Sequence, residues 1–113
     1  MQDRVLSLLG LAAKAGRIES GGFAAEKAVK SFRAFLVILA GDAQKNTAKR
    51  FGDMCTFYEV PLRRYGTRES LGHAIGKEYR SCLAVTDRGF AESMKKLLGS
   101  GEERGCNGED ENQ

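Results

Sequence analysis

Phe35-Leu-Val-Ile-Leu-Ala40 is a continuous apolar run rich in branched side chains. Such a run is typical of a strand that is covered on both faces. We therefore expect residues 35–40 to form the central strand of a sheet with helices packed on both sides.

Helical and extended patterns alternate on either side of this run. Apolar residues recur at helical spacing in several segments, and short apolar or branched segments separate them. We predict helices over residues 2–15, 20–31, 44–58, 67–75 and 90–98, and extended segments over residues 17–19, 35–40, 60–65 and 81–86. The alternation predicts an α/β fold, a three-layer α/β/α sandwich with a mixed, largely parallel sheet of about four strands.

Capping residues support several of these boundaries. Ser20, Thr67 and Asp87 each precede a predicted helix and carry a side-chain oxygen that can accept from its first turn. Gly16 and Gly99 follow predicted helices, where glycine tolerates the left-handed backbone of a helix end.

The chain has 113 residues, 42% hydrophobic and 29% charged, which is enough for one cored domain and too few for two. Its net charge of +3 combines −4 in residues 102–113, with five acids and one base, and +7 in residues 1–101, with 17 bases and 10 acids. We expect one domain over residues 1–99 and a disordered acidic tail over residues 100–113, which hold almost no apolar side chains. The basic body suits a polyanion such as RNA, although the same balance can serve solubility alone.

The N-terminal residues lack a basic segment followed by an uninterrupted apolar run, and no later run is long enough to span a bilayer. We therefore expect a cytoplasmic protein without membrane contact. Cys55, Cys82 and Cys106 lie far apart without Cys-x-x-Cys spacing, which argues against disulfides and zinc. We expect Cys55 and Cys82 to be buried thiols, and Cys106 to be an exposed residue of the tail.

Two predicted helix starts, in residues 19–29 and 66–77, combine small residues with cations close behind. Free backbone N–H groups and the positive end of the helix dipole favour an anion at such a start. In the first of them, Phe23 and Lys27 flank Gly21 and Gly22, so a phosphate could bind the glycine N–H groups while a base stacks on the ring. The alternative is that Phe23 is a core or staple residue and Lys27 a solvated side chain.

Four motifs then follow in order at plausible spacings: Ser-Gly-x-x-x-x-x-Lys-Ala (20–28), Leu-Val-Ile-Leu-Ala-x-Asp-Ala (36–43), Gly-Thr-Arg-Glu-x-Leu-Gly-x-Ala-x-Gly (66–76) and Ala-Val-Thr-Asp (84–87). As a set, over residues 2–98, they resemble the bacterial YlxQ-type proteins. Those proteins belong to the superfamily of kink-turn RNA-binding ribosomal proteins, of the L-seven-Ae and L-thirty-e type. The resemblance implies an α/β/α sandwich and a non-catalytic protein that binds structured RNA, with the ribosome as a candidate partner in translation.

Kink-turn binders of that superfamily carry Gly-x-Asn-Glu-x-x-Lys at the start of the second helix, where Asn and Glu read sheared G·A pairs. Gly21 and Lys27 match this pattern, but Phe23 and Ala24 stand in place of Asn and Glu. A phenyl ring and a methyl group cannot make the paired hydrogen bonds that direct readout of a base edge needs. We therefore expect weakened kink-turn readout.

The resemblance also assigns roles beyond the first helix start. Arg68 replaces a family lysine, Asp42 matches an acidic position at a strand end, and residues 77–81 correspond to a loop that touches extruded nucleotides. Tyr79 could stack on a base there or pack against the last helix. The predicted RNA-binding residues are Gly21, Gly22, Phe23, Lys27, Lys30, Asp42, Arg68, Lys77, Tyr79 and Arg80.

Two other functions remain open. Asp42, Asp87, His73 and Cys82 could belong to a small metal-dependent enzyme, although their positions in the predicted elements do not bring them together. Alternatively, Phe23, Phe32 and Tyr79 could form an exposed apolar patch of a protein-interaction module of the translation machinery. We expect no catalysis, no cofactor and no metal, and a monomer.

Overall fold

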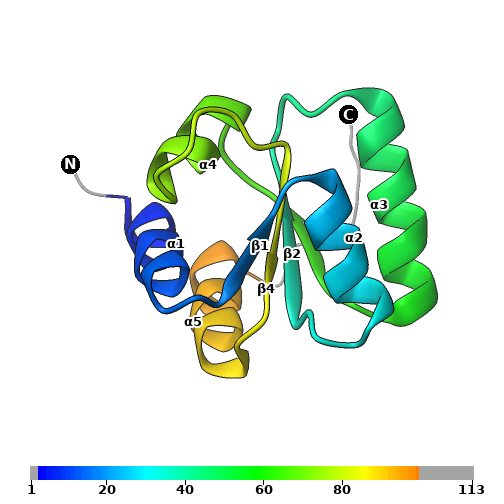
Figure 1. Cartoon of the computed structure of the whole chain (residues 1–113), viewed down its shortest axis with the longest axis horizontal. Coiled ribbons are helices and arrows are strands. Elements are labelled where there is room, and N and C mark those ends of the chain that lie inside the picture. The colour runs from blue at the N-terminus through cyan, green and yellow to red at the C-terminus, as the bar shows by residue number, and fades with distance from the viewer. Residues whose placement is uncertain (1–2, 100–113) are drawn as a thin grey trace.

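Helices and strands alternate in the computed structural model, which describes residues 3–99 (Figure 1). The helices are α1 (Arg4–Lys14), α2 (Gly22–Lys30), α3 (Lys45–Tyr58), α4 (Arg68–Ala74) and α5 (Arg88–Leu98). The strands are β1 (Ile18–Ser20), β2 (Leu36–Leu39), β3 (Leu62–Arg64) and β4 (Cys82–Val85). Every predicted element is therefore present, with ends shifted by a few residues. Within the described range, no helix is long and apolar enough to cross a membrane.

The four strands form one mixed sheet in the order β1-β4-β2-β3. β2 pairs with β3 in parallel, whereas β4 lies between β1 and β2 and is antiparallel to both. The prediction of a mixed four-stranded sheet is confirmed, but the prediction that it is largely parallel is wrong. A parallel neighbour needs a connection that returns the chain to the starting edge of the sheet. The short helix α4 instead stays at the edge where β3 ends, so β4 enters from that edge and runs back.

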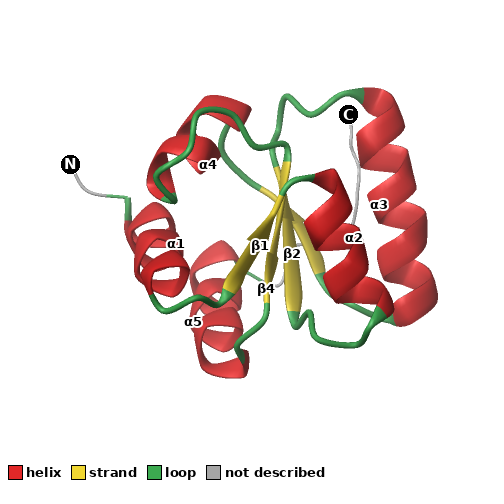
Figure 2. Cartoon of the chain, in the orientation of Figure 1, coloured by secondary structure: helices red, strands yellow, loops and turns green. Residues whose placement is uncertain are grey.

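The core explains the layers on the two faces of the sheet (Figure 2). All four residues of β2 are buried, as expected for the central strand. Because side chains alternate along a strand, Leu36 and Ile38 pack with α1, α4 and α5, while Val37 and Leu39 pack with α2 and α3. The sheet and the helices on its two faces therefore form three layers.

Local hydrogen bonds fix the helix ends. The Thr67 hydroxyl accepts from the Ser70 amide at 3.0 Å while the Ser70 hydroxyl accepts from the Thr67 amide at 2.9 Å, a complete capping box. Asp87 accepts from the Phe90 amide at 2.9 Å, and the backbone turns to positive φ at Gly16 and Gly99. The predicted caps at these positions are confirmed.

The predicted N-cap at Ser20 is wrong. Ser20 is the last residue of β1, paired with Leu83, and Gly21 occupies the N-cap position with φ 94°. Glycine reaches this backbone conformation without the steric penalty that a side chain would bring. The chain therefore passes directly from strand to helix at Gly21.

Cys55 and Cys82 are buried free thiols, as predicted. The predictions for Cys106 and for the acidic tail at residues 100–113 lie outside the described residues.

Candidate nucleic-acid interface

One edge of the sheet gathers the segments that the sequence singled out. β1, β2 and β3 run in the same direction, so their carboxyl ends meet there together with the start of the antiparallel strand β4. We call residues 20–27, 41–45, 64–69 and 77–81 the loop edge. It lies at the top of Figure 1, where α2, α3 and α4 begin.

Backbone hydrogen bonds join these segments to one another. The Gly21 amide donates to the Cys82 carbonyl at 3.0 Å, and the Gly41 amide donates to the Gly66 carbonyl at 2.8 Å. The Arg80 amide donates to the Arg68 carbonyl at 3.0 Å. The loop edge is thus one connected structure, although its parts lie far apart in the sequence.

The start of α2 offers backbone donors that have no partner among residues 3–99. No side chain caps it, so the N–H groups of its first turn, beginning at Gly22, remain available. The Gly21 N–H, predicted to be free as well, is instead used by the Cys82 carbonyl. Gly21 therefore shapes the helix start, and Gly22 and the next residues present the donors.

Phe23 and Lys27 both reach solvent beside this helix start. The Phe23 side chain is 83% exposed, which contradicts the alternative that it is a core or staple residue. Lys27 is exposed and forms no ion pair with any residue between 3 and 99. A ring and an ammonium group thus flank the donors, as the spacing predicts.

Glu26 organises the cations on the next turn of α2. It accepts from Arg50 of α3 and forms an ion pair with Lys30 at 2.8 Å. The hydrogen bond from Lys30, followed by the nearby charges, lowers the pKa of the Glu26 carboxyl, and the same contact raises the pKa of Lys30. The predicted site residue Lys30 is therefore already paired with a carboxylate and is less available to bind a phosphate.

Both carboxylate oxygens of Asp42 lie against Arg68 at the start of α4, so neither is free to bind a ligand. Its Oδ1 accepts from the Arg68 amide at 2.8 Å, and its Oδ2 lies 3.6 Å from Arg68 Nε. The Arg68 Nε is shielded from solvent and forms no hydrogen bond. Asp42 thus positions the arginine that the sequence predicts as a phosphate contact.

The loop over residues 77–81 brings a second ring and two further cations. Tyr79 is 62% exposed, which contradicts the alternative that it packs against the last helix. Arg80 Nε donates to the Ser20 hydroxyl at 3.2 Å, and Arg80 Nη1 donates to the Tyr79 carbonyl at 2.7 Å. Arg80 therefore joins this loop to the end of β1, while Lys77 is exposed.

The loop lies directly on α4 because of Gly72. A Cβ atom at Gly72 would lie 2.3 Å from the Glu78 carbonyl oxygen, far inside any normal contact. Only glycine therefore allows residues 77–81 to pack this closely.

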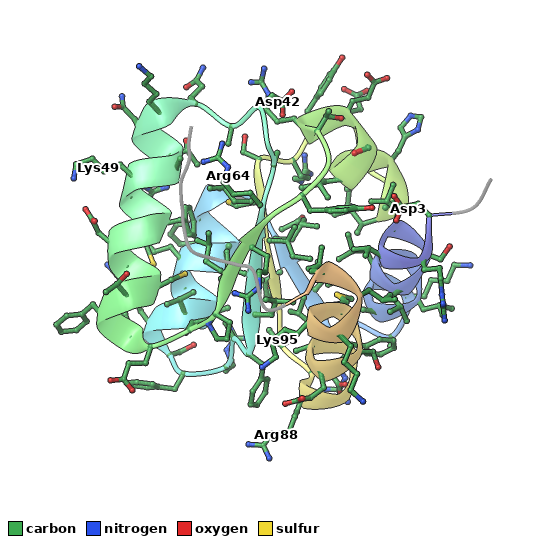
Figure 3. All side chains as sticks on the ribbon, turned by 180° about the vertical axis from the view of Figure 1, so that it is seen from behind. Asp3, Asp42, Lys49, Arg64, Arg88 and Lys95 are labelled. Carbon is green, nitrogen blue, oxygen red and sulfur yellow. The ribbon has the colours of Figure 1, made fainter. Side chains whose placement is uncertain are left out.

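Two arginines of this region were missed by sequence reasoning. Arg50 lies beside the helix start, since a Cβ at Gly22 would be 3.1 Å from Arg50 Nη2. Arg64 donates through Nη2 to the Gly41 carbonyl at 2.9 Å, just below Asp42 (Figure 3). Neither belongs to a local motif, because Arg50 reaches the edge from the middle of α3 and Arg64 from a strand.

The charge of the loop edge is moderately positive. Its four segments hold six cationic side chains and four carboxylates, and Arg50 adds a further cation against Glu26. An electropositive surface of this kind favours a polyanion, with a strong dependence on salt.

The residues of the enzyme alternative are not brought together. Asp42 lies at the loop edge, whereas Asp87 caps α5 beyond the other end of β4. His73 is exposed on α4, and burial raises the pKa of the Cys82 thiol to about 11. Cys82 therefore stays protonated and is a poor nucleophile at neutral pH.

The apolar patch of the interaction-module alternative is also divided. Phe32 follows the far end of α2 and makes an edge-to-face contact with Tyr58, with ring centroids 5.6 Å apart. α2 has nine residues; Phe23 lies in its first turn, and Phe32 lies beyond its last residue. The positions of Phe23 and Phe32 at opposite ends of α2 argue against the alternative in which Phe23, Phe32 and Tyr79 share one patch.

Solved structures share this architecture. A protein of unknown function from Bacillus halodurans C superposes with a TM-score of 0.83 and 40% identity, covering 86% of this chain and 98% of that chain. A Giardia lamblia 15.5kD RNA binding protein superposes with a TM-score of 0.74 and 20% identity, covering 87% of this chain and 90% of that chain. At this identity, the superposition shows a shared fold alone. The class is thus that of small α/β proteins with a four-stranded mixed sheet and several helix starts at one edge.

The family follows from the sequence. Residues 3–95 match the Ribosomal protein L7Ae/L30e/S12e/Gadd45 family, and the chain belongs to it. It is 46% identical over 91 residues to RNA-binding protein YlxQ of Bacillus subtilis (strain 168), covering 80% of this chain and 91% of that protein. The chain is also 31% identical over 97 residues to RNA-binding protein YlxQ of Enterococcus faecium, covering 86% of this chain and 93% of that protein. The resemblance drawn from the four motifs is confirmed.

Proposed function

We propose that this protein binds structured RNA at the loop edge and catalyses no reaction. The observation that carries the proposal is the uncapped start of α2, whose N–H donors lie next to the exposed Phe23 and Lys27. Membership of the family and the names of its two YlxQ relatives support RNA as the ligand.

The proposed contacts divide into phosphate and base contacts. Phosphate oxygens accept from the first-turn N–H groups of α2 and from Lys27, Arg68 and Arg80, which fixes the RNA backbone on the protein. Phe23 and Tyr79 are exposed rings on which unpaired bases can stack without sequence readout. This division predicts binding that depends more on RNA shape and salt than on sequence.

Selective kink-turn recognition is weakened in this proposal. Phe23 and Ala24 occupy the two positions where the resemblance places the base-reading Asn and Glu, and neither can donate or accept a hydrogen bond through its side chain. A ribosomal or another structured RNA is then held mainly through its backbone and its stacked bases.

Neutralising the three proposed phosphate contacts tests the proposal. We expect the triple variant Lys27→Gln, Arg68→Gln, Arg80→Gln to bind structured RNA more weakly and to reduce the steepness of the fall of log K with log salt by about 2 to 3. Each single variant should show part of the effect. Titration of a labelled RNA at several salt concentrations measures both quantities.

The matched control removes the same charge elsewhere. Lys14 and Arg17 at the end of α1 and Arg88 at the start of α5 are exposed and lie outside the loop edge. The triple variant Lys14→Gln, Arg17→Gln, Arg88→Gln should keep most of the affinity. Equal losses in the two triple variants would show that net charge, rather than this surface, governs binding.

A further inference from the structure

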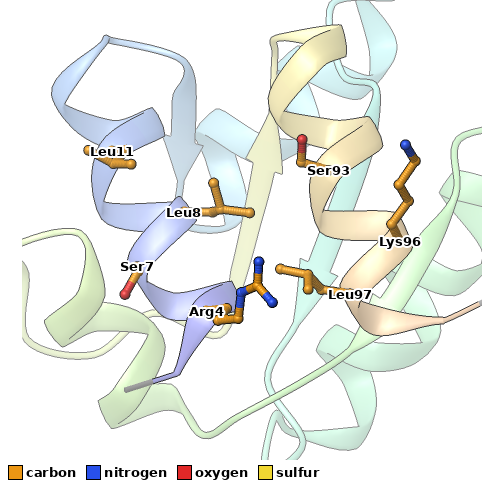
Figure 4. A pocket seen from close by; sticks show the side chains of 7 residues that line it. All are labelled: Arg4, Ser7, Leu8, Leu11, Ser93, Lys96 and Leu97. Atoms are coloured by element: carbon orange, nitrogen blue, oxygen red, sulfur yellow. The ribbon is translucent and has the colours of Figure 1, made fainter. Parts of the chain in front are cut away.

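A groove of about 510 Å³ lies between α1 and α5 in the layer that faces away from α2 and α3 (Figure 4). Its lining residues come from these two helices alone. They are the apolar Leu8, Leu11 and Leu97, the hydroxyl-bearing Ser7 and Ser93, and the cationic Arg4 and Lys96.

Two of the three leucines of the groove are exposed, whereas Leu8 is partly buried and also packs against the core. Leu11 is 56% exposed and Leu97 is 39% exposed, whereas Val5, Leu9 and Met94 of the same helices are buried against the sheet. Beside its core face, α1 therefore presents Leu8 and Leu11 to the groove, and α5 presents Leu97. On α1 the lining residues Arg4, Ser7, Leu8 and Leu11 follow the i, i+3, i+4 and i+7 spacing of one helix face.

The cations of the groove have no carboxylate partner. No acidic residue lines the groove, and neither Arg4 nor Lys96 forms an ion pair with any described residue. Figure 4 shows Leu8 and Leu97 pointing toward each other across the groove, with the Arg4 guanidinium between them at its lower end. The surface thus presents apolar side chains flanked by unpaired positive charge.

We propose that this groove binds an acidic amphipathic helix of another protein. Apolar anchors at i, i+3 or i+4, and i+7 of such a helix would cover the three leucines, and its flanking carboxylates would pair with Arg4 and Lys96. The lining residues extend from Arg4 to Leu11 along α1, about 10 Å of helix at about 1.5 Å per residue, which is enough for two turns of a partner.

Other occupants fit the lining less well. No aromatic ring lines the groove, and stacking of RNA bases relies on such rings. A small molecule would remain largely open to solvent between half-exposed leucines, whereas ligand sites enclose most of their ligand.

Two occupants from this protein itself are also disfavoured. Residues 100–113 are acidic, but Cys106 is their only apolar side chain, so they cannot cover three leucines. In a two-fold interface between copies the same patch meets itself, which would bring Arg4 and Lys96 toward like charges.

Amide spectra of the full isotope-labelled chain test the proposal. The probe is a synthetic helical peptide with leucines at i, i+3, i+4 and i+7 and glutamates on both flanks, compared with the same peptide carrying lysines in place of the glutamates. We expect shifts confined to α1 and α5 and at least about tenfold weaker binding of the lysine peptide.

Variants locate the contact. Leu11→Glu, and separately the pair Arg4→Glu with Lys96→Glu, should each weaken binding of the acidic peptide by about tenfold. These side chains are exposed, so the variants should fold, and their amide spectra will show it. Lys49→Glu on α3 reverses one positive charge away from the groove and should leave binding unchanged.

Several results would overturn the proposal. Equal affinity for the two peptides, shifts outside α1 and α5, or no binding would each contradict an acidic helical partner. Shifts of the α1 and α5 amides on removal of residues 100–113, or with rising concentration of the chain alone, would assign the groove to the tail or to a second copy instead.

Discussion

Phe23 and Ala24 decide what kind of RNA contact the start of α2 can make. Phe23 is 83% exposed, so its ring is available to a ligand and contributes little to the core. A stacked ring tolerates any base, whereas the Asn and Glu that the resemblance places at these two positions would read particular base edges. In the proposed function, the absence of polar groups at these two positions separates RNA binding from kink-turn selectivity.

Restoring the polar pair should restore selectivity. For Phe23→Asn with Ala24→Glu, we expect the preference for a kink-turn over the same RNA with its sheared G·A pairs replaced to rise by about 1 to 3 kcal/mol, by analogy with base contacts in DNA. Paired titrations of the two RNAs measure this ratio.

Phe57→Asn serves as the control, because Phe57 is 78% exposed but lies near the end of α3, far from that helix's start at the loop edge. It should leave the ratio unchanged. An unchanged ratio in the double variant itself would show that positions 23 and 24 do not face base edges.

Sequence patterns predicted only those parts of the loop edge that belong to a local motif. Lys27 follows the helix start at a fixed spacing, and Thr67 and Ser70 form their capping box within four residues. Arg50 lies in a helix and Arg64 in a strand, and the apolar patterns of these two elements predict only which of their residues are buried. Their contacts with Glu26 and the Gly41 carbonyl join residues distant in sequence, which no periodicity reveals.

Gly72 sets the contact between α4 and the loop over residues 77–81. For Gly72→Ala we expect the free energy of unfolding to fall by about 1 to 3 kcal/mol, because the new methyl group meets the Glu78 carbonyl. RNA affinity should fall as well, because Tyr79 and Arg80 move with the loop. Urea unfolding and RNA titration measure the two effects.

Gly52 provides the matched substitution. It lies within α3, and a Cβ there would meet no atom within 4 Å. Gly52→Ala should raise the free energy of unfolding by up to about 1 kcal/mol through helix propensity and leave RNA binding unchanged. Parental stability in Gly72→Ala would contradict the close packing of the loop.

A hydrogen bond between Tyr65 and Asp3 ties the start of α1 to the end of β3. Tyr65 donates to Asp3 Oδ2, while Asp3 Oδ1 accepts from the Leu6 amide at 3.0 Å. The contact with Tyr65 is the main cause that lowers the pKa of Asp3, and it raises the pKa of Tyr65 to about 12.

Replacing Tyr65 by Phe should change stability in a defined pH range. The lowered pKa of Asp3 gives stability that is present above its unfolded value and is lost as the pH falls through its folded value. The raised pKa of Tyr65 gives stability that is lost as the pH rises from about 10 toward about 12. We expect Tyr65→Phe to lower the free energy of unfolding by about 1 kcal/mol at neutral pH and by less toward both ends.

Urea unfolding from acid to alkaline pH measures this difference. Tyr58→Phe is the control, because the Tyr58 hydroxyl makes no hydrogen bond with a residue in the described range. A constant difference between Tyr65→Phe and the parent at every pH would show that the Asp3 contact does not contribute.

The order of the strands was the part of the fold that the sequence could not supply. Each strand has a local signature, and the run at residues 35–40 correctly predicts a buried central strand. The neighbours of that strand depend on contacts between distant segments, such as Leu36 with Val85. The apolar pattern of β4 fits a parallel or an antiparallel position equally well, so the pattern could not reveal that the sheet is largely antiparallel.

Charge is divided unequally along the chain, with −4 in residues 102–113 and +7 in residues 1–101. If the acidic residues compete with RNA for the basic loop edge, removing residues 100–113 should raise RNA affinity. The gain should be greatest at low ionic strength, where charges interact over longer distances. RNA titrations of the full and shortened chains over a range of salt concentrations measure it.

A second variant separates charge from length. Replacing Glu102, Glu103, Glu109, Asp110 and Glu111 by their amides keeps every residue of the segment but removes its negative charge. It should reproduce the gain. Equal affinity of the parent and both variants at low salt would refute competition by the acidic residues.

The position of β4 in the sheet has a consequence for how the protein is made. β4 is the last of the described strands to be synthesised, yet it is the one neighbour of β1 in the sheet and one of the two neighbours of β2. A growing chain that ends before residue 82 therefore cannot close its sheet, and the backbone bonds that unite the loop edge, such as Gly21 to Cys82, cannot form. If the loop edge binds RNA as proposed, fragments that stop before residue 82 should therefore fail to bind it.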